Sequence, residues 1–109
     1  MTKAEGVAWA AGFLEGEGSF HVWRRKNGQY PRVKASQNER EPLERLVTIF
    51  GGTINVERHA GSDRPNRKTI WYWSLTGKKA VPVMEAVLPF MSARRRVQIF
   101  VALGRSGVV

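Results

Sequence analysis

The sequence predicts an α+β domain with the element order αββαββαα and a four-stranded antiparallel sheet that has its helices on one face. Three observations support this: helical spacing of apolar residues in four segments, alternation of apolar and polar residues in four others, and Gly, Pro or Asn turn signals between them. A length of 109 residues suits one domain, and no low-complexity linker divides the chain. We therefore expect residues 1–109 to form a single domain.

The first helix, expected over Glu5–Gly16, is apolar on more than one side. It carries an aliphatic stripe, an aromatic stripe of Trp9 and Phe13, and a third surface of small residues. A helix that is apolar all round is buried all round, and in so short a chain a second copy could bury the extra face. We expect a homodimer interface, whose residues would be Ala8, Ala11, Gly12 and Glu15.

Two strands follow, over Ser19–Arg25 and Arg32–Gln37, with a connecting loop from Lys26 to Tyr30 or Pro31. Both strands alternate apolar and polar residues, so one face of the hairpin should be apolar and the other basic and polar. The residues expected to point inward are Phe20, Val22, Val33 and Ala35.

The later elements follow from the same signals. In chain order they are a helix over Asn38–Phe50, a strand over Thr53–Arg58, a polar loop over His59–Asn66, a strand over Lys68–Leu75, a helix over Lys78–Leu88, a last helix capped by Ser92, and a frayed tail over Gly104–Val109. Pro42 should occupy a first helical turn, and Gly51 and Pro89 should end helices. The inward residues should be Ile54, Val56, Trp71, Trp73 and Leu75 in the strands and Val97, Phe100, Val101 and Leu103 in the last helix.

Charge is the strongest compositional feature of the chain. Eighteen Lys and Arg oppose nine Asp and Glu, which gives a net charge of +9 and a pI near 10.9. Such a surplus favours a polyanionic partner, either nucleic acid or an acidic membrane surface, although a merely soluble basic protein has the same composition. No apolar run reaches the roughly 18 residues of a membrane span, and no signal-peptide pattern or Cys is present. We therefore expect a cytoplasmic protein without membrane association, in a bacterial or phage-type host cell or an organelle.

Two carboxylates, Glu15 and Glu17, stand among glycines where the first helix should end. A helix C-terminus carries partial negative charge, so acids there are unfavourable unless a cation compensates them. Hard divalent cations prefer carboxylate and carbonyl oxygens, which makes this segment a candidate metal site. The alternative is that both residues are solvated side chains that follow a helix.

The segment Ala10-Ala11-Gly12-Phe13-Leu14-Glu15-Gly16-Glu17-Gly18 resembles the signature of the LAGLIDADG homing endonucleases. Ala10 stands where the family has its first Leu, and Glu replaces both Asp. Four further segments resemble the family in order, from about Ala8 to Leu103; they are Ser36–Leu43, Phe50–Gly52, Trp71–Gly77, and Leu88–Met91 followed by Arg94–Arg96.

The resemblance implies a site-specific, metal-dependent endonuclease that hydrolyses phosphodiester bonds of double-stranded DNA and, with one motif copy, acts as a homodimer. It implies Glu17 as a ligand of Mg²⁺ or Mn²⁺ with the Gly16 carbonyl, and no small-molecule cofactor. It also implies catalytic roles for Gln37 and Arg94, in positioning water and stabilising charge near the scissile phosphate. Arg94 replaces the family's Lys and can clamp a phosphate, but it cannot act by changing protonation.

The polar face of the sheet is expected to enter the major groove of DNA. The candidate nucleic-acid contacts are His21, Trp23, Arg25, Arg32, Lys34, Ser36, Asn55, Glu57 and Tyr72 on strands, Arg24, Lys26, Asn27 and Arg67 in loops, and Arg40, Arg95 and Arg96 near the catalytic candidates. The three consecutive arginines are unfavourable near a helix N-terminus, which favours phosphate contact. A register slip of one residue would exchange the two faces.

Two alternatives to an active nuclease remain open from the sequence. One is a catalytically silent protein of this fold, either a DNA-binding regulator or an intron maturase that grips RNA. The other is a small RNA-binding domain that stacks bases on sheet aromatics. The inward placement expected for Trp71 and Trp73 argues against the second alternative.

Overall fold

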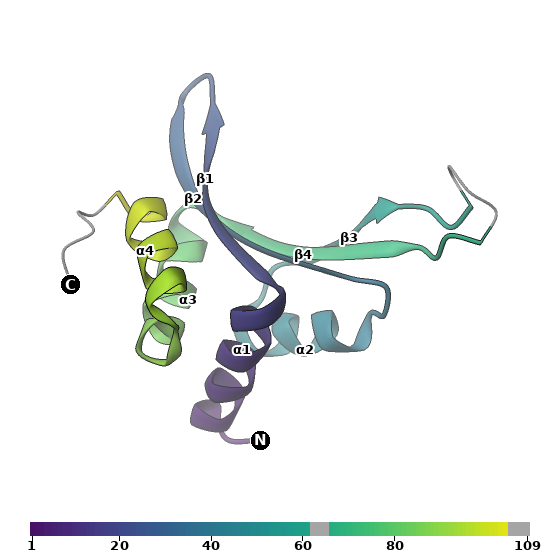
Figure 1. Cartoon of the computed structure of the whole chain (residues 1–109), viewed down its shortest axis with the longest axis horizontal. Coiled ribbons are helices and arrows are strands. Elements are labelled where there is room, and N and C mark those ends of the chain that lie inside the picture. The colour runs from purple at the N-terminus through teal and green to yellow at the C-terminus, as the bar shows by residue number, and fades with distance from the viewer. Residues whose placement is uncertain (62–65, 105–109) are drawn as a thin grey trace.

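The computed structural model describes residues 1–61 and 66–104. Its elements are α1 (Lys3–Glu17), β1 (Gly18–Arg25), β2 (Gly28–Gln37), α2 (Glu41–Phe50), β3 (Thr53–Arg58), β4 (Ile70–Thr76), α3 (Ala80–Val87) and α4 (Ala93–Ala102), with single 3₁₀ turns η1 (Gly77–Lys79) and η2 (Leu88–Phe90) on either side of α3. The predicted order αββαββαα is confirmed (Figure 1). The middle of the predicted polar loop and most of the predicted tail lie outside the described residues.

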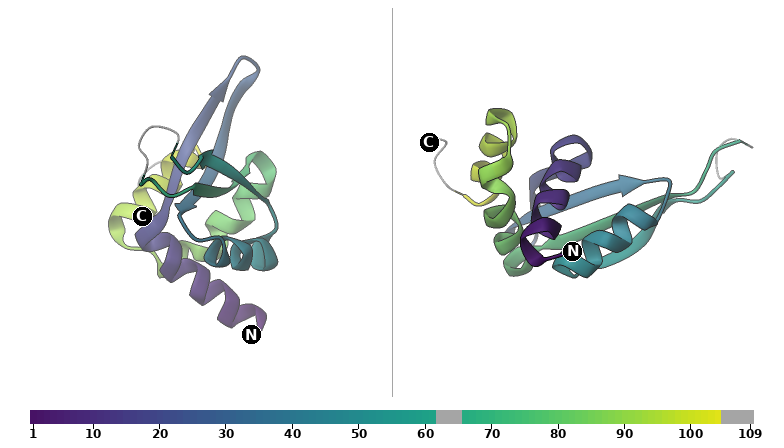
Figure 2. Two further views of the ribbon diagram at one scale, coloured as in Figure 1. Left: turned by 90° about the vertical axis from the view of Figure 1, so that its right-hand side faces the viewer. Right: turned by 90° about the horizontal axis from the view of Figure 1, so that it is seen from below.

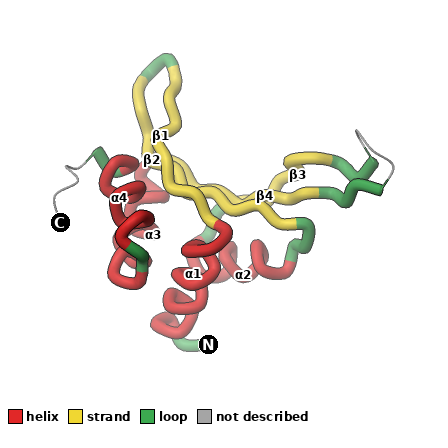
Figure 3. The backbone as a smooth tube through the Cα atoms, in the orientation of Figure 1, coloured by secondary structure: helices red, strands yellow, loops and turns green. Residues whose placement is uncertain are grey.

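The four strands form one antiparallel sheet in the order β1-β2-β4-β3. The pairs Phe20 with Val33 and Ala35 with Trp73 place apolar side chains on a common face, as the alternation predicts. The helices lie on this side of the sheet, and the opposite face is left without a covering helix (Figures 1 and 3). Fold class and face assignment therefore agree with the sequence.

The β1–β2 hairpin is longer than predicted. The turn contains only Lys26 and Asn27, and β2 begins at Gly28, whose φ of 143° is a conformation that other residues rarely adopt. Pro31 lies within β2 opposite Val22 and lacks a donor, but β4 pairs with β2 only from Arg32 onward. Pro31 is tolerated because β2 has no second neighbour there. The hairpin therefore extends beyond the rest of the sheet (Figures 1 and 2).

α1 begins two residues earlier than predicted because Thr2 and Glu5 form a capping box. The Thr2 side chain accepts the Glu5 N–H, and the Glu5 side chain accepts the Thr2 N–H. The helix ends at Gly18, where an added Cβ would lie 2.8 Å from the carbonyl oxygen of Leu14. Glycine is thus required where α1 turns into β1.

The core lies between the sheet and the helices and is centred on Trp73, which is fully buried. Its indole N–H donates to the carbonyl oxygen of Gly51 at 2.8 Å, so the end of α2 is tied to β4. α2 begins at Glu41 rather than Asn38, and Pro42 lies in its first turn. The predicted inward placement of Ile54, Trp71 and Leu75 is confirmed by their burial or packing against the core; the buried side chains of this core also include Leu14, Leu43, Leu46, Met84 and Ile99.

The predicted inward face of α4 is partly wrong. Val97 and Val101 are 47% and 57% exposed, whereas Arg95, Ile99 and Ala102 are buried. The side of the helix that carries Ile99 also carries an arginine four residues earlier, so apolar spacing alone selected the wrong side. No helix in the described part of the chain is both long and apolar enough to cross a membrane.

Candidate DNA interface and acidic site

The end of α1 and the start of α4 are joined by a reciprocal network. The Glu15 carboxylate accepts the Ser92 backbone N–H at 2.7 Å and its hydroxyl at 2.9 Å. In return, Nε of Arg95 donates to the Glu15 carbonyl oxygen at 3.0 Å. The hydrogen bond from the Ser92 backbone is the main reason that the pKa of Glu15 lies below its usual value. An anion therefore faces the positive end of α4 and a cation faces the negative end of α1.

This network corrects one of the predicted nucleic-acid contacts, and a second one also has partners inside the chain. Arg95 is only 7% exposed and also donates to Gln98, so it is buried inside the subunit rather than available to a phosphate. Arg96 donates to the carbonyl oxygens of Met91 and Pro89, which gives its guanidinium a structural role at the end of η2. The unfavourable dipole that suggested phosphate contact is compensated by Glu15 instead.

Arg94 differs from the two arginines that follow it. Its side chain is exposed at the first turn of α4 and forms no hydrogen bond within the described part of the chain. It lies close enough to Glu15 to contribute to the lowered pKa of that carboxyl. Of the three consecutive arginines, Arg94 is therefore the one whose donors remain available.

Glu17 is the last residue of α1, and its carboxylate is exposed. Unlike Glu15, it forms no hydrogen bond or ion pair with any described residue. The next residue, Gly18, pairs with Ala35, so Glu17 and Gln37 lie at the same end of the β1–β2 ladder. The network around Glu15 holds the start of α4 against the end of α1, so the three predicted catalytic residues come from segments that meet near the junction of α1 with β1.

A single subunit offers few metal ligands near the junction of α1 with β1. Among the described residues, no group of three or more His, Asp or Glu side chains could hold an ion. Glu17 provides one carboxylate and the exposed residue Gly16 a backbone carbonyl, both hard oxygen donors of the kind that Mg²⁺ prefers. This donor set fits a divalent ion only if water, substrate phosphate or a second subunit completes it.

The uncovered face of the sheet, which we call the polar sheet face, carries the predicted strand contacts. Cross-strand pairs place His21 opposite Arg32, and Ser36 opposite Tyr72, whose other neighbour is Asn55. The predicted residues that share this face are His21, Trp23, Arg25, Arg32, Lys34, Ser36, Asn55, Glu57 and Tyr72. The structure thus assembles the predicted strand residues on one surface.

Two neighbouring groups on this face have partners of their own. Nζ of Lys34 forms a short ion pair with Glu57 and lies 4.7 Å from the centre of the Tyr72 ring. The hydrogen bond from Lys34 is the main cause of a lowered pKa of Glu57. The pKa of His21 is also lowered, mainly by burial and then by Arg32 and Lys34, so this imidazole is neutral at pH 7 and can donate or accept.

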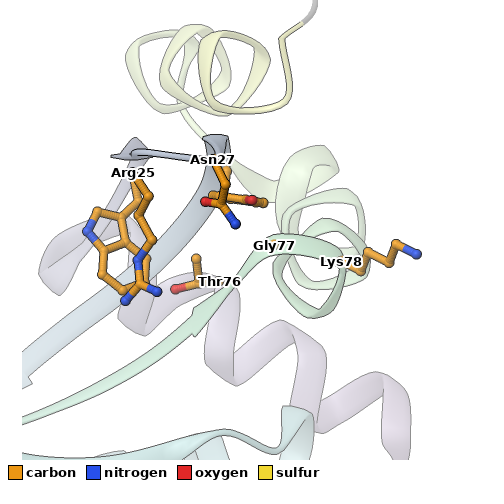
Figure 4. A pocket seen from close by; sticks show the side chains of 7 residues that line it. Arg25, Asn27, Thr76, Gly77 and Lys78 are labelled. Atoms are coloured by element: carbon orange, nitrogen blue, oxygen red, sulfur yellow. The ribbon is translucent and has the colours of Figure 1, made fainter.

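Trp23 contacts two arginines. The guanidinium carbon of Arg25 lies 3.9 Å from the centre of its ring, and that of Arg32 lies at 4.5 Å. Beside them is an open hollow of about 290 Å³, shown in Figure 4; its lining residues are Trp23, Arg25, Asn27, Tyr30, Thr76, Gly77 and Lys78. This hollow lies where the hairpin meets the end of β4.

The predicted loop contacts are more dispersed. Arg24 and Lys26 are exposed near the tip of the hairpin, and Arg67 precedes β4 and is half-buried. Arg40 lies before α2 with its guanidinium carbon 4.6 Å from the centre of the Trp71 ring. The tip of the hairpin is continuous with the polar sheet face, whereas Arg40 stacks on a residue of the apolar face.

The predicted dimer face is partly corrected. Ala11 is 1% exposed and packs in its own subunit's core, so it cannot meet a second copy. Ala8 and Gly12 are exposed, and Glu15 is half-exposed with its carboxylate bound to Ser92. A Cβ added at Gly12 would have no atom within 4 Å, and the same holds at Gly16. Packing within the described chain therefore gives no reason for glycine at these two positions.

Comparison with known proteins identifies the fold. No protein-family model matches the sequence, and no curated protein matches it either. Among solved structures, the chain is similar to the homing endonuclease I-CvuI in complex with its target in the presence of 2 mM Ca. The sequence identity is 19% and the TM-score is 0.70, and the match covers 94% of this chain and 66% of that one. It is also similar to the archaeal intron-encoded homing endonuclease I-Vdi141I complexed with DNA, with 22% identity and a TM-score of 0.62, covering 90% and 67%.

The chain therefore has the fold of the LAGLIDADG homing endonucleases, and the predicted fold class is confirmed. It spans about two thirds of the length of these two structures. At identities of 19% and 22%, the similarity to these structures establishes the architecture alone.

Proposed function

We propose that this protein is a site-specific endonuclease for double-stranded DNA, active as a homodimer with a divalent metal ion. The observation that carries the proposal is the position of Glu17. It is the one acid of the motif that has no internal partner, and its segment meets the segments that carry Gln37 and Arg94. A carboxylate held there without compensation is suited to a cation, and that cation could in turn attract a phosphate.

The residues near the junction of α1 with β1 would have different roles in phosphodiester hydrolysis. A Mg²⁺ or Mn²⁺ ion held by Glu17 and the Gly16 carbonyl would supply charge stabilisation at the phosphate and a more acidic bound water. Gln37 would orient the attacking water through its amide. Arg94 would bind the phosphate with its planar, permanently charged fork.

A homodimer would bring two copies of the junction of α1 with β1 together. The exposed small residues of α1 support such an interface, since Gly12 has open space where a side chain would stand. In a two-fold dimer the same face meets itself, and small residues allow two helices to approach closely. Each subunit would then present its polar sheet face to one half of the DNA site.

The test of the activity is cleavage of the protein's own genomic locus, joined across any intron or insertion. Purified protein should cut this DNA with Mg²⁺ or Mn²⁺ but not with chelator, and Glu17→Gln should bind without cutting. Glu44→Gln, an exposed carboxylate on α2, is the matched control and should cut normally. Binding without cutting under any divalent cation would instead identify a silent binding protein, such as a regulator or a maturase.

The test of the dimer is the mass of the protein in solution. Gly12→Leu fits the isolated subunit because nothing lies within 4 Å of the new Cβ, but it would hold two helices apart. Sedimentation should show a dimer for the wild type and a monomer for Gly12→Leu, with Thr48→Leu on exposed α2 surface as the control. A wild type that stays monomeric at all concentrations and on DNA would refute the dimer.

A further inference from the structure

The contacts of Trp23 set two arginines apart from the other cations of the sheet. Arg25 stands two residues after Trp23 on the same strand, and Arg32 stands on β2 beside it, opposite His21. Both guanidinium carbons lie within 4.5 Å of the indole ring centre. Trp23 is itself half-buried and paired with Tyr30. The half-buried ring is therefore a shared platform that both guanidinium groups contact.

The hydrogen-bond donors of these two arginines remain unused. Neither guanidinium forms a hydrogen bond or ion pair with any described residue, and Nε of Arg32 is buried without a partner. Lys34, by contrast, is occupied by Glu57. Stacking restricts the orientation of the arginine side chains while their donors stay free, so less conformational freedom is lost when a ligand binds.

The ligand that fits such a group is planar and accepts two parallel hydrogen bonds. In the major groove, guanine presents this pattern through O6 and N7, and arginine bound to it in bidentate fashion is the commonest specific contact. Phosphates also accept the arginine fork, and the exposed Arg24 and Lys26 near the hairpin tip are available to them. Arg25 and Arg32 instead lie on the polar sheet face, which would enter the groove, and this position favours the base edge.

We infer that Trp23 is a positioning residue that holds Arg25 and Arg32 to read guanine bases in the major groove. Each half of the DNA site would then contain guanine at two positions that face the β1–β2 hairpin. This inference rests on the proposed function, because it requires the polar sheet face to bind duplex DNA. Beyond the proposed function, the inference specifies which residues determine the preferred DNA sequence and which base they select.

The experiment is selection of bound sequences from a randomised DNA duplex pool by the full-length protein, with chelator present so that no DNA is cut. Wild type should enrich guanine at two fixed positions in each half. Arg25→Lys and Arg32→Lys keep the charge but lose the planar fork, and each should lower the preference at one position by roughly ten- to a hundredfold. Arg45→Lys, the same change at an α2 arginine that lies over the Trp9 ring and outside the sheet, should leave both preferences intact.

Trp23→Leu should weaken the preference for guanine at both positions together. It removes the ring that both arginines contact and leaves the arginines themselves in place. A variant that only destabilised the fold would bind all sequences more weakly and would not change the base preference. Thermal melting followed by circular dichroism would verify that the variant is folded. If Trp23→Leu does not fold, the two Arg→Lys variants still decide the question.

Three results would overturn the inference in distinguishable ways. Selected sites without fixed guanines would refute base reading while leaving DNA binding intact. Uniform weakening on all sequences, with a shallower dependence of binding on salt, would assign the arginines to phosphates. Recovery of no DNA at all would refute the proposed function itself, and the inference with it.

Discussion

The junction of α1 with α4 and the polar sheet face both collect arginines, but they use them differently. At the junction, Arg95 and Arg96 donate to carbonyl oxygens of their own chain. On the sheet, Arg25 and Arg32 contact an aromatic ring and keep their donors open. The surplus of positive charge therefore does not by itself locate a ligand-binding surface, because part of it compensates helix ends.

The same contrast separates the two acids of the motif. Glu15 is bound by Ser92 and lies near Arg95, whereas Glu17, two residues later, has no partner within the described residues. One acid stabilises the junction, and the other remains available to a ligand. The predictions below test this division of roles, from the largest expected effect to the smallest.

The largest effect is expected from Glu17→Gln on cleavage. We expect a loss of about a thousandfold or more in the cleavage rate, since several kcal/mol of metal-mediated charge stabilisation would be removed. The melting temperature should hardly change, because the carboxylate has no internal partner. Single-turnover cleavage and thermal melting of the same preparation would measure both. A variant that melts early and still cuts would reverse the roles of the two acids.

Arg95→Met should be the most destabilising change at the junction. It removes charge-assisted hydrogen bonds from a buried group to Glu15 and Gln98, and we expect the free energy of unfolding to fall by about 2–3 kcal/mol. Arg94→Met, next to it but exposed, should change stability by less than about 0.5 kcal/mol while impairing cleavage. Urea denaturation would compare the two. Equal losses of stability would show that the junction does not depend on Arg95.

Glu15 should make the stability of the junction pH-dependent. Its pKa is lowered in the folded chain, chiefly by the Ser92 backbone hydrogen bond, so its stabilising contribution is present above the ordinary pKa of 4.5. That contribution is lost as pH falls through the lower, folded value. The melting temperature of wild type should therefore exceed that of Glu15→Gln at neutral pH, and the difference should shrink below pH 4.5. A difference that is constant down to acid pH would contradict this assignment.

The smallest effect is expected from Glu57→Gln on the polar sheet face. The pair of Glu57 with Lys34 is partly exposed, and such pairs contribute between 0 and about 1 kcal/mol and are screened by salt. Urea denaturation at low and high salt should show a small loss that vanishes as salt rises. A loss as large as that of Arg95→Met would mean that the sheet face is held together by its charges, as the junction is.

Alternation and turn signals were sufficient to predict the sheet. They correctly separated Val33 and Ala35 from Arg32 and Lys34, because successive side chains of a strand point to opposite faces. The hairpin length was predicted less well, since Pro31 suggested a loop and its tolerance depends on where β4 stops pairing. The start of α1 at Lys3 could also have been predicted from the sequence, because Thr2 and Glu5 have the spacing of a capping box.

The errors arose where the role of a residue depends on distant partners. Arg95 was predicted as a surface cation and is buried, because Glu15, 80 positions earlier, meets it across the fold. Ala11 was assigned to a surface between subunits and belongs to the core of its own. Neither outcome leaves a signal in the neighbouring sequence.

The sequence by itself determined the order of the elements, the two faces of the sheet and the candidate site that contains Glu17, because these follow from local periodicity and from a contiguous motif. Only the tertiary structure decided which charged groups are occupied inside the chain and which are left for a ligand. The physical reason is that compensation of a charge depends on distance in space, and the chain brings these partners together only when it folds.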